Sequence, residues 1–404
     1  MKLLLLPALA FAAFSFTAFA GDWPQFRGPA STGVLADGKI PAKPRIAWSA
    51  ALPGRGLASP IVVGGKVFVA CSSGPKQERL HLICFGAADG AKIWERQLQA
   101  TGRTMSHPKT SVAACTPCSD SRRVFVLWSC NDLAAFDLDG DLLWVRGLTA
   151  DYANASNSLG MASSPIVIGE TVVAMIENDS ESYSLGIEAG TGVNLWKLDR
   201  PKAANWTSPV PWRADAKDPF VALLQSSKGL VAVDPNSGSR LWEYSSGAST
   251  TSSSVVADGV IYAPSNGITA LRPQAGNAAP EQIWNSKQIN PSTISPVVLG
   301  GRIFSFNNAG VITCADAKSG EIRWKLRMTG PFSGSPVGAG PHLLAVNEKG
   351  LVQVLDVTKP EGAVVGTLQL PLKEGTKELV LCTPALDGKH VFVRTDSTLW
   401  RIGE

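Results

Sequence analysis

The sequence lacks any run of lysine and arginine, and its formal net charge is only +4. Nucleic-acid-binding domains carry a basic stripe or patch, so a nucleic-acid partner is disfavoured. After residue 20 no segment is apolar enough to span a bilayer. Only four histidines occur (His81, His107, His342 and His390), and none has a partner at metal-ligand spacing. The motifs G-x-S-x-G, H-E-x-x-H and G-x-x-x-x-G-K-[ST] are missing, so common hydrolase, zinc-protease and nucleotide-binding signatures are excluded.

The first twenty residues predict a targeting segment. Lys2 supplies the positive end, an apolar stretch follows, and Ala18-Phe19-Ala20 forms a small-x-small cleavage site before Gly21. This pattern is typical of a secretory signal peptide over residues 1–20, although an uncleaved anchor is the alternative. No cysteine follows the site, so a lipid anchor is disfavoured. We therefore expect a periplasmic or secreted protein that is not inserted in the membrane.

Seven cysteines would then lie in an oxidising compartment, and an odd number leaves at least one unpaired within the chain. Cys115 and Cys118 are too far apart in an extended strand to form a disulfide. Cys71 and Cys84 fall on neighbouring predicted strands, so their placement allows one. The other cysteines are interpreted as small buried apolar residues.

A repeat dominates the rest of the chain. A Ser or Thr followed by Pro, or once by Val, precedes a short apolar run eight times, at intervals of roughly 40 to 57 residues. The eight positions are Ser59, Thr116, Ser164, Ser208, Ser254, Ser295, Ser335 and Thr383. Repeats of this length predict one closed array of similar units rather than several separate domains.

Each unit reads as four short strands. In the first, an apolar run after Ser59 is followed by the turn Gly64-Gly65, a second run over 66–70, a third over 80–85 and a fourth centred on Trp94. A four-stranded antiparallel sheet of this kind has two apolar faces. Stacking the sheets radially around an axis buries both faces. The prediction is an all-β, eight-bladed β-propeller over residues 45–404, preceded by an N-terminal arm over 21–44.

The two chain ends predict how the ring closes. The last unit stops one strand short at Glu404, whereas an unpartnered strand around Trp48 precedes the first unit. We expect this strand to complete the last blade and so remove an exposed edge. The alternative is a ring of seven blades, which would follow if the weak fifth unit, which starts at Ser254-Val255, is misread. Trp23 and Phe26 in the arm are expected to cover the outside or the base of the ring.

Two turns carry a recognisable signature. Segments 234–242 (DPNSGSRLW) and 315–324 (ADAKSGEIRW) resemble A-x-D-x-x-[ST]-G-x-x-x-W, which defines PQQ-like repeats of quinoprotein-dehydrogenase-type propellers. The opening DWPQFRGP of residues 22–29, ASSP of 162–165 and DRP of 199–201 are similar to a secreted bacterial branch of that family. The resemblance implies that one tryptophan per blade docks the neighbouring blade. These residues are Trp48, Trp94, Trp144, Trp196, Trp242, Trp284 and Trp324.

The resemblance also raises dehydrogenase chemistry, which would need PQQ, Ca²⁺ and a carboxylate base. The disulfide between adjacent cysteines that often covers the quinone in that class is missing, and no C-x-x-C-H haem site is present, since Ser119 follows Cys118. Glu177, Asn178 and Asp179 form the richest acidic cluster and the weak metal candidate, with a solvated loop as the simpler interpretation.

The remaining candidates are polar connectors and one tryptophan outside the docking pattern. His107 and Lys109 could bind an anion on a face of the ring, and a long polar stretch contains Asp151 and Asn157. Trp206 could face the channel as a stacking platform, although buried packing is the simpler alternative. Together with Glu177 and Asp179, these are the candidate ligand-face residues.

The sequence therefore favours an exported, non-catalytic propeller that needs no cofactor. Its expected partner is a protein, peptide or glycan of the cell envelope, and a monomer is favoured. The first alternative is a PQQ- and Ca²⁺-dependent dehydrogenase acting on alcohols or sugars. The second is a hydrolase- or lyase-like propeller that uses channel carboxylates. A repeat scaffold alone does not choose among these functions.

Overall fold

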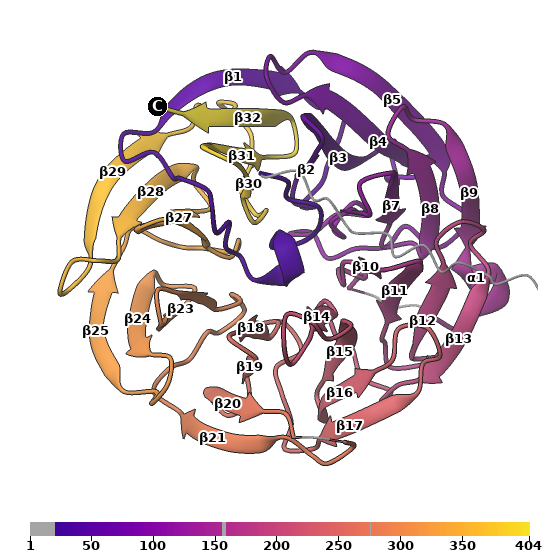
Figure 1. Ribbon diagram of the computed structural model, residues 1–404. Coiled ribbons are helices and arrows are strands. Elements are labelled where there is room, and N and C mark those ends of the chain that lie inside the picture. Colours follow the sequence, from indigo (N-terminus) through magenta and orange to yellow (C-terminus); the bar gives the residue numbers. More distant parts are fainter. Residues whose placement is uncertain (1–20, 156–158, 275) are drawn as a thin grey trace, which may run out of the picture.

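The computed structural model describes residues 21–155, 159–274 and 276–404. Eight four-stranded antiparallel sheets are arranged around a central axis like blades (Figure 1). The first strand of each blade lies nearest the axis and the fourth forms the outer rim, so the chain runs outward within each blade. The all-β, eight-bladed prediction is confirmed. The signal peptide predicted over 1–20 lies outside the described residues.

The first four blades are formed by consecutive strands. Blade 1 contains β2 (Ile61–Val63), β3 (Lys66–Ser73), β4 (Arg79–Gly86) and β5 (Lys92–Gln99); blade 2 contains β6 (Cys118–Ser119), β7 (Arg123–Leu127), β8 (Asp132–Asp137) and β9 (Leu142–Gly147); blade 3 contains β10 (Ile166–Ile168), β11 (Thr171–Ile176), β12 (Tyr183–Glu188) and β13 (Asn194–Asp199); blade 4 contains β14 (Val210–Trp212), β15 (Val221–Ser226), β16 (Gly229–Val233) and β17 (Arg240–Tyr244). A short helix, α1 (Leu148–Asp151), follows blade 2.

The other four blades repeat this arrangement, except that the last takes its outer strand from the start of the chain. Blade 5 contains β18 (Val255–Ala257), β19 (Val260–Ala263), β20 (Ile268–Arg272) and β21 (Glu281–Ser286); blade 6 contains β22 (Val297–Leu299), β23 (Arg302–Phe306), β24 (Val311–Asp316) and β25 (Ile322–Arg327); blade 7 contains β26 (Val337–Ala339), β27 (His342–Val346), β28 (Leu351–Asp356) and β29 (Ala363–Gln369); blade 8 contains β30 (Ala385–Asp387), β31 (His390–Arg394), β32 (Thr398–Gly403) and β1 (Arg45–Ala51).

Blade 8 closes the ring non-covalently. β1 pairs antiparallel with β32, and Trp48 lies opposite Arg401 while Ser49 lies opposite Trp400. The predicted closure is therefore confirmed, and the inner strands of blade 8 gain the outer partner that they would otherwise lack.

Tryptophans join neighbouring blades through glycine turns. The Trp94 indole N–H donates to the Leu138 carbonyl of blade 2 at 3.1 Å. Gly140 in the same turn has φ +92°, and a Cβ there would lie 2.8 Å from the Trp94 ring. Glycine is thus required both by the backbone conformation and by the close approach of the ring. The same contact recurs between Trp48, Trp144, Trp196, Trp284 or Trp324 and a glycine of the following blade. Trp242 instead packs edge-on against Trp212 of its own blade.

In the fifth blade, the predicted position of the repeat serine, Ser254, is wrong by one residue. The first strand of that blade begins at Val255, two residues after Ser253, as β2 begins two residues after Ser59. Ser253 is therefore the equivalent of the other seven Ser or Thr residues, and Ser254 occupies the position of the proline. A serine there keeps a backbone N–H that proline lacks, and Gln225 Oε1 accepts it at 2.9 Å.

The cysteines are all free and buried. Cys71 lies opposite His81 in the sheet, whereas Cys84 lies opposite Phe68. Cys71 packs in the core between blades 8 and 1, and Cys84 packs in the core between blades 1 and 2. The two side chains point to opposite faces of one sheet, so the disulfide that the sequence allowed is wrong.

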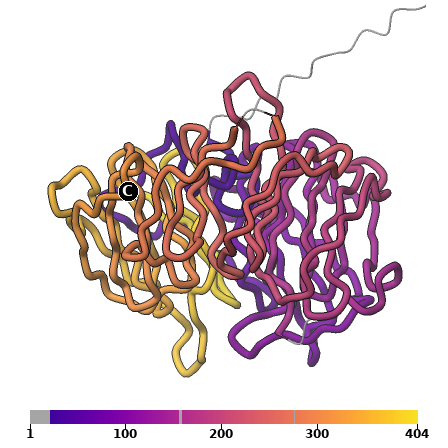
Figure 2. The backbone as a smooth tube through the Cα atoms, turned by 90° about the horizontal axis from the view of Figure 1, so that it is seen from below, coloured from indigo at the N-terminus to yellow at the C-terminus, as the bar shows by residue number. Residues whose placement is uncertain are grey.

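The N-terminal arm closes one end of the central channel. Trp23 pairs with Val62 of blade 1, and Val34 pairs with Gly338 of blade 7. Between them, the turn η1 (Pro29–Ser31) contacts β14 and β18 near the axis (Figure 1). We call this end the base. At the opposite end, the mouth, the connections between blades form the surface, and in Figure 2 they lie on the lower side of the disc. Among the described residues, no helix is long and apolar enough to cross a membrane.

Candidate binding cup in the central channel

The channel is a cup of about 400 Å³ that opens at the mouth. Two tiers of residues line it, and each blade contributes one residue to each tier. The lower tier contains Ser59, Thr116, Ser164, Ser208, Ser253, Ser295, Ser335 and Thr383, and the upper tier contains Leu57, Ala114, Ala162, Trp206, Thr251, Thr293, Ser333 and Leu381. The tiers are two residues apart in sequence because side chains of an extended segment alternate in direction, so every second residue faces the axis.

The lower tier is held by a chain of hydrogen bonds around the axis. The backbone N–H of each member donates to the side-chain hydroxyl of the member in the next blade, from Ser59 to Thr116 and onward to Thr383, at 2.9–3.1 Å. Seven of the eight neighbouring pairs are joined in this way, and the chain of bonds is interrupted between Thr383 and Ser59 at the seam where the ring closes. We call these eight residues the hydroxyl ring. Each joined hydroxyl uses an acceptor site for its neighbour and keeps its own O–H to donate.

The upper tier has two unlike halves. Five consecutive blades, from blade 8 through blade 4, contribute an apolar wall of Leu381, Leu57, Ala114, Ala162 and Trp206. Blades 5 to 7 contribute the hydroxyl-bearing residues Thr251, Thr293 and Ser333. The Trp206 ring is half-buried and is fixed by a hydrogen bond from its indole N–H to the Gly160 carbonyl at 2.9 Å.

The arm supplies the floor of the cup. Phe26 is the arm residue that lines the cavity. Arg27, the next residue, is fully buried and donates to the Ser254 carbonyl at 3.2 Å and to the Pro296 carbonyl. These carbonyls follow directly after Ser253 and Ser295 of the hydroxyl ring. Burial lowers the pKa of the Arg27 guanidinium to about 9, because desolvation penalises the charged form.

The rim is formed in part by the connection between blades 1 and 2. His107 and Lys109 in this connection both line the cup. Lys109 reaches Glu348 of blade 7 in an ion pair of 2.6 Å, and Ser333 also donates to that carboxylate at 2.6 Å. The positive charge of Lys109 at the rim is therefore already neutralised by Glu348, which does not line the cavity.

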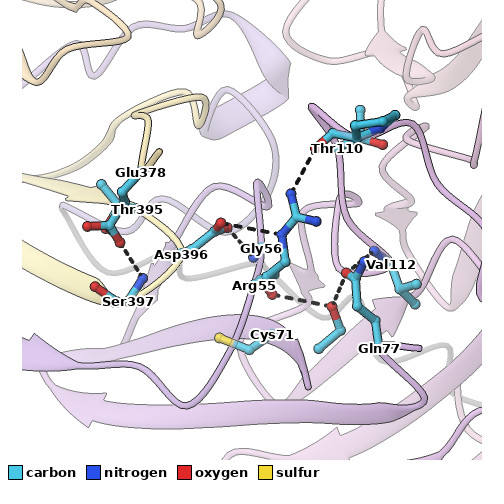
Figure 3. A network of polar contacts seen from close by, with 12 residues as sticks. Arg55, Gly56, Cys71, Gln77, Thr110, Val112, Glu378, Thr395, Asp396 and Ser397 are labelled. Atoms are coloured by element: carbon cyan, nitrogen blue, oxygen red, sulfur yellow. Dashed lines mark hydrogen bonds and ion pairs between the residues drawn. The ribbon is translucent and has the colours of Figure 1, made fainter. Parts of the chain in front are cut away.

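A polar network joins blade 8 to blade 1 beside the mouth (Figure 3). Arg55 contacts Asp396 at 3.4 Å and donates to the Pro108 carbonyl at 3.0 Å. On the blade 8 side, Glu378 accepts from the Thr395 hydroxyl and from the Ser397 amide at 2.6 and 2.8 Å. The network fixes the connections that surround the apolar wall.

We expect the protein to lose stability in acid because Glu378 belongs to this network. Burial alone would raise the pKa of the Glu378 carboxyl, but the hydrogen bonds from Thr395 and Ser397 outweigh that effect, and its pKa lies below its ordinary value. A carboxyl whose pKa falls on folding stabilises the fold above its unfolded pKa. We expect this stabilisation to disappear as the pH falls below 4.5. Denaturant midpoints measured against pH should show it.

The control lies in the same loop. Glu378→Gln should flatten the acid limb of the midpoint profile, whereas Glu374→Gln, which changes an exposed residue, should preserve it. An acid limb that is unchanged in Glu378→Gln would show that the network does not contribute.

The cup brings together three of the residues that the sequence proposed, namely His107, Lys109 and Trp206. The others lie elsewhere. Asp151 pairs with Arg146 at the outer side of blade 2, and Asn157 lies outside the described residues.

The acidic candidates also lie away from the cup. Glu177 is buried in an ion pair with Arg200 at 2.5 Å and also accepts from Asn205. Burial raises the pKa of Glu177, while Arg200 opposes the shift. Asn178 caps its own turn by accepting the Ser180 amide, and Asp179 accepts the Ala204 amide. In the described part of the chain, no group of three or more His, Cys, Asp or Glu is arranged to hold a metal ion.

Calcium and a quinone can be tested against this lining. Ca²⁺ takes six to eight oxygen ligands, usually with several carboxylates. The described lining residues include no Asp or Glu, and the hydroxyl oxygens of the ring already accept backbone N–H groups. The described lining therefore does not fit a calcium-bound quinone.

Comparison with known proteins identifies the family. The fold defines a PQQ-like repeat β-propeller. A family model described as outer membrane protein assembly factor BamB matches residues 41–181, 78–289 and 264–402. The chain belongs to this family. No curated protein shows significant sequence similarity to it.

Solved structures share the fold at low sequence identity. BamB from Moraxella catarrhalis superposes with a TM-score of 0.62 at 14% identity, over 89% of this chain and 98% of that chain. A quinohemoprotein alcohol dehydrogenase from Comamonas testosteroni gives 0.68 at 15% identity, over 96% of this chain and 82% of that chain. A europium-containing methanol dehydrogenase superposes with a TM-score of 0.70 at 13% identity, over 95% of this chain and 98% of that chain. Both dehydrogenases and a BamB share this architecture, so the fold does not choose between their functions.

Proposed function

We propose that the protein is a non-catalytic binding scaffold of the cell envelope, which holds a protein, peptide or glycan partner at the mouth of its channel. The observation that carries the proposal is the chemistry of the cup. Its lining combines hydroxyls with an apolar wall and includes no described carboxylate that could act as base or metal ligand. Such a surface suits binding better than calcium-dependent quinone chemistry, which needs carboxylate ligands.

Membership of the BamB family supports an envelope location and a protein partner. The sequence pattern of residues 1–20 agrees with export. The base supports the same role, because the arm pairs with blades 1 and 7 and covers the channel from that side. A partner would therefore approach from the mouth.

Quinone binding is the decisive test against the dehydrogenase alternative. Purified protein mixed with PQQ and Ca²⁺ is expected to show no saturable change in the quinone absorption spectrum and no dye reduction with alcohols or aldoses. The reason is the missing carboxylate ligands. Saturable PQQ binding accompanied by turnover would reverse the assignment.

Site-specific crosslinking tests the partner. A photoreactive residue in place of Leu57, at the mouth, is expected to capture a partner in envelope extract that purified components then reproduce. The matched control replaces Val193, which is 60% exposed on the outer rim. Equal capture at both positions, or none at Leu57, would contradict binding at the mouth.

A further inference from the structure

Two buried arginines beside the cup have no acidic partner. Arg27 lies under the hydroxyl ring and Arg394 lies in the wall of blade 8, and both are fully buried. Arg394 donates to the carbonyls of Ala70 and Thr395 at 2.5 and 2.8 Å. Neither guanidinium forms an ion pair with a described carboxylate, in contrast to buried Arg200, which has Glu177. The molecule therefore carries two uncompensated positive charges in its interior.

Both charges are close to the ligand cavity. Arg27 is bonded to the residues that follow Ser253 and Ser295, and its Nε has no acceptor although it is buried. Arg394 presses against the residue before Leu57, since a Cβ on Gly56 would lie 2.3 Å from its guanidinium. Charges screened little by water act over longer distances than exposed ones. Both guanidinium groups therefore contribute positive charge beside the cup, and the described lining residues include no carboxylate. Glu348, which contacts the lining residues Lys109 and Ser333, is paired with the Lys109 ammonium.

The hydroxyl ring adds directional donors to this positive charge. Because the ring oxygens accept the N–H of the neighbouring blade, their remaining O–H groups are available at the bottom of the cup. Several converging donors above a buried cation form a receptor for an anionic oxygen, since hydrogen bonds to ionised acceptors are the strongest kind.

The wall above the ring defines the rest of the ligand. Its apolar half runs without interruption over five blades and ends at the Trp206 ring. Its opposite half, formed by Thr251, Thr293 and Ser333, can bond amide groups. A volume of about 400 Å³ lies at the lower end of the range for small-ligand pockets. The cup thus suits one carboxylate, an adjacent apolar group and a few amides.

We propose that the cup binds the C terminus of a peptide or protein, with the terminal carboxylate at the hydroxyl ring and an apolar last side chain against the Trp206 wall. This mode is one of the recurring ways in which peptides are recognised. The inference rests on the proposed scaffold function and names the part of the partner that the cup holds. An acidic sugar shares the carboxylate but lacks the apolar group.

Calorimetry with small probes tests the ligand. N-acetyl-alanyl-phenylalanine with a free carboxylate is expected to bind at least about tenfold more tightly than its C-terminal amide, because the amide has no charge to place at the ring. Quenching of Trp206 fluorescence should follow the same titration and be lost in Trp206→Phe. Equal affinities for acid and amide, or binding of galacturonic acid alone, would overturn the proposal.

A matched pair of variants tests the charge. Ala162→Glu places a carboxylate in the apolar wall, whereas Ala162→Gln adds the same bulk without charge. We expect Glu to weaken binding of the free acid at least about tenfold relative to Gln, because like charges repel strongly in a desolvated site. Equal binding by both variants would contradict an anion at this site. Arg27→Gln should weaken binding as well, and the Ala162 pair decides the question if that variant does not fold.

The experiments distinguish failure of the scaffold function from failure of the C-terminal ligand. If neither peptide binds but crosslinking from Leu57 still captures a partner, the scaffold function stands and the C-terminal ligand is wrong. If the acid also fails to bind and Leu57 captures no partner, the scaffold function is wrong as well.

Discussion

Replacing Trp94 with alanine is expected to lower the free energy of unfolding by about 3–5 kcal/mol, the usual loss for a large buried aromatic residue. The indole lies in the core between blades 1 and 2 and is only 8% exposed. It packs against Phe68 with 5.7 Å between ring centroids and donates to the Leu138 carbonyl. The variant loses the docking contact, the hydrogen bond and the volume of the ring together. Urea titrations followed by circular dichroism would measure the change.

Gly140 provides the control for this docking contact. Gly140→Ala should also destabilise the ring, because its Cβ would meet Trp94 at 2.8 Å and its φ is +92°. In the Trp94→Ala background the clash with the ring disappears, whereas the backbone strain and the 3.2 Å approach to Arg96 remain, so the second substitution should cost less there. Additive losses, or a loss below about 1 kcal/mol for Trp94→Ala, would contradict docking by the indole.

Glu177→Gln is expected to cost about 3–5 kcal/mol, because it leaves the buried Arg200 guanidinium without its counter-charge. The two groups are almost fully buried and lie 2.5 Å apart. Arg200 also donates to the carbonyls of Leu224 and Gln225 in blade 4, so the pair joins blade 3 to blade 4. The measurement is again the free energy of unfolding in urea.

A double substitution and an exposed pair complete this experiment. Glu177→Gln combined with Arg200→Met should lose less than the sum of the single changes, because no charge is then left buried alone. Asp139→Asn breaks an ion pair with Lys66 in which the Asp139 side chain is 86% exposed, and it should change stability by less than about 1 kcal/mol. An equal loss in Glu177→Gln and Asp139→Asn would show that burial of the Arg200 pair is unimportant.

The repeat predicted the architecture because one local pattern had to be satisfied eight times. Ser-Pro or Thr-Pro before an apolar run marks the start of seven innermost strands, and a glycine turn that receives a tryptophan of the preceding blade recurs at six blade junctions. The unpaired strand around Trp48 was enough to predict closure. The register of the fifth unit was wrong because the pattern was followed as Ser254-Val255, although Ser254 stands in place of the proline.

The cup could be predicted only in part. The Ser and Thr residues were visible as markers of the repeat, but their convergence on one axis follows from the radial arrangement of the blades. The upper tier lies two residues earlier and has no common residue type, so it carried no signal. Arg27 is a single residue in the arm, and nothing local indicates that it would contact blades 5 and 6. Glu177 was predicted as a ligand-face residue because it is acidic, but its buried partner Arg200 lies on a different segment, so the ion pair was not predicted.

The pairing of β1 with β32 sets the order in which the molecule can mature. During synthesis β1 emerges long before its partner β32, so the nascent chain carries an unsatisfied edge strand until β32 has been made. Joining such distant segments costs loop-closure entropy, and contacts of this kind slow folding. The intermediate that still lacks this pairing exposes the apolar surface of blade 8, which is the kind of surface that a holding chaperone binds.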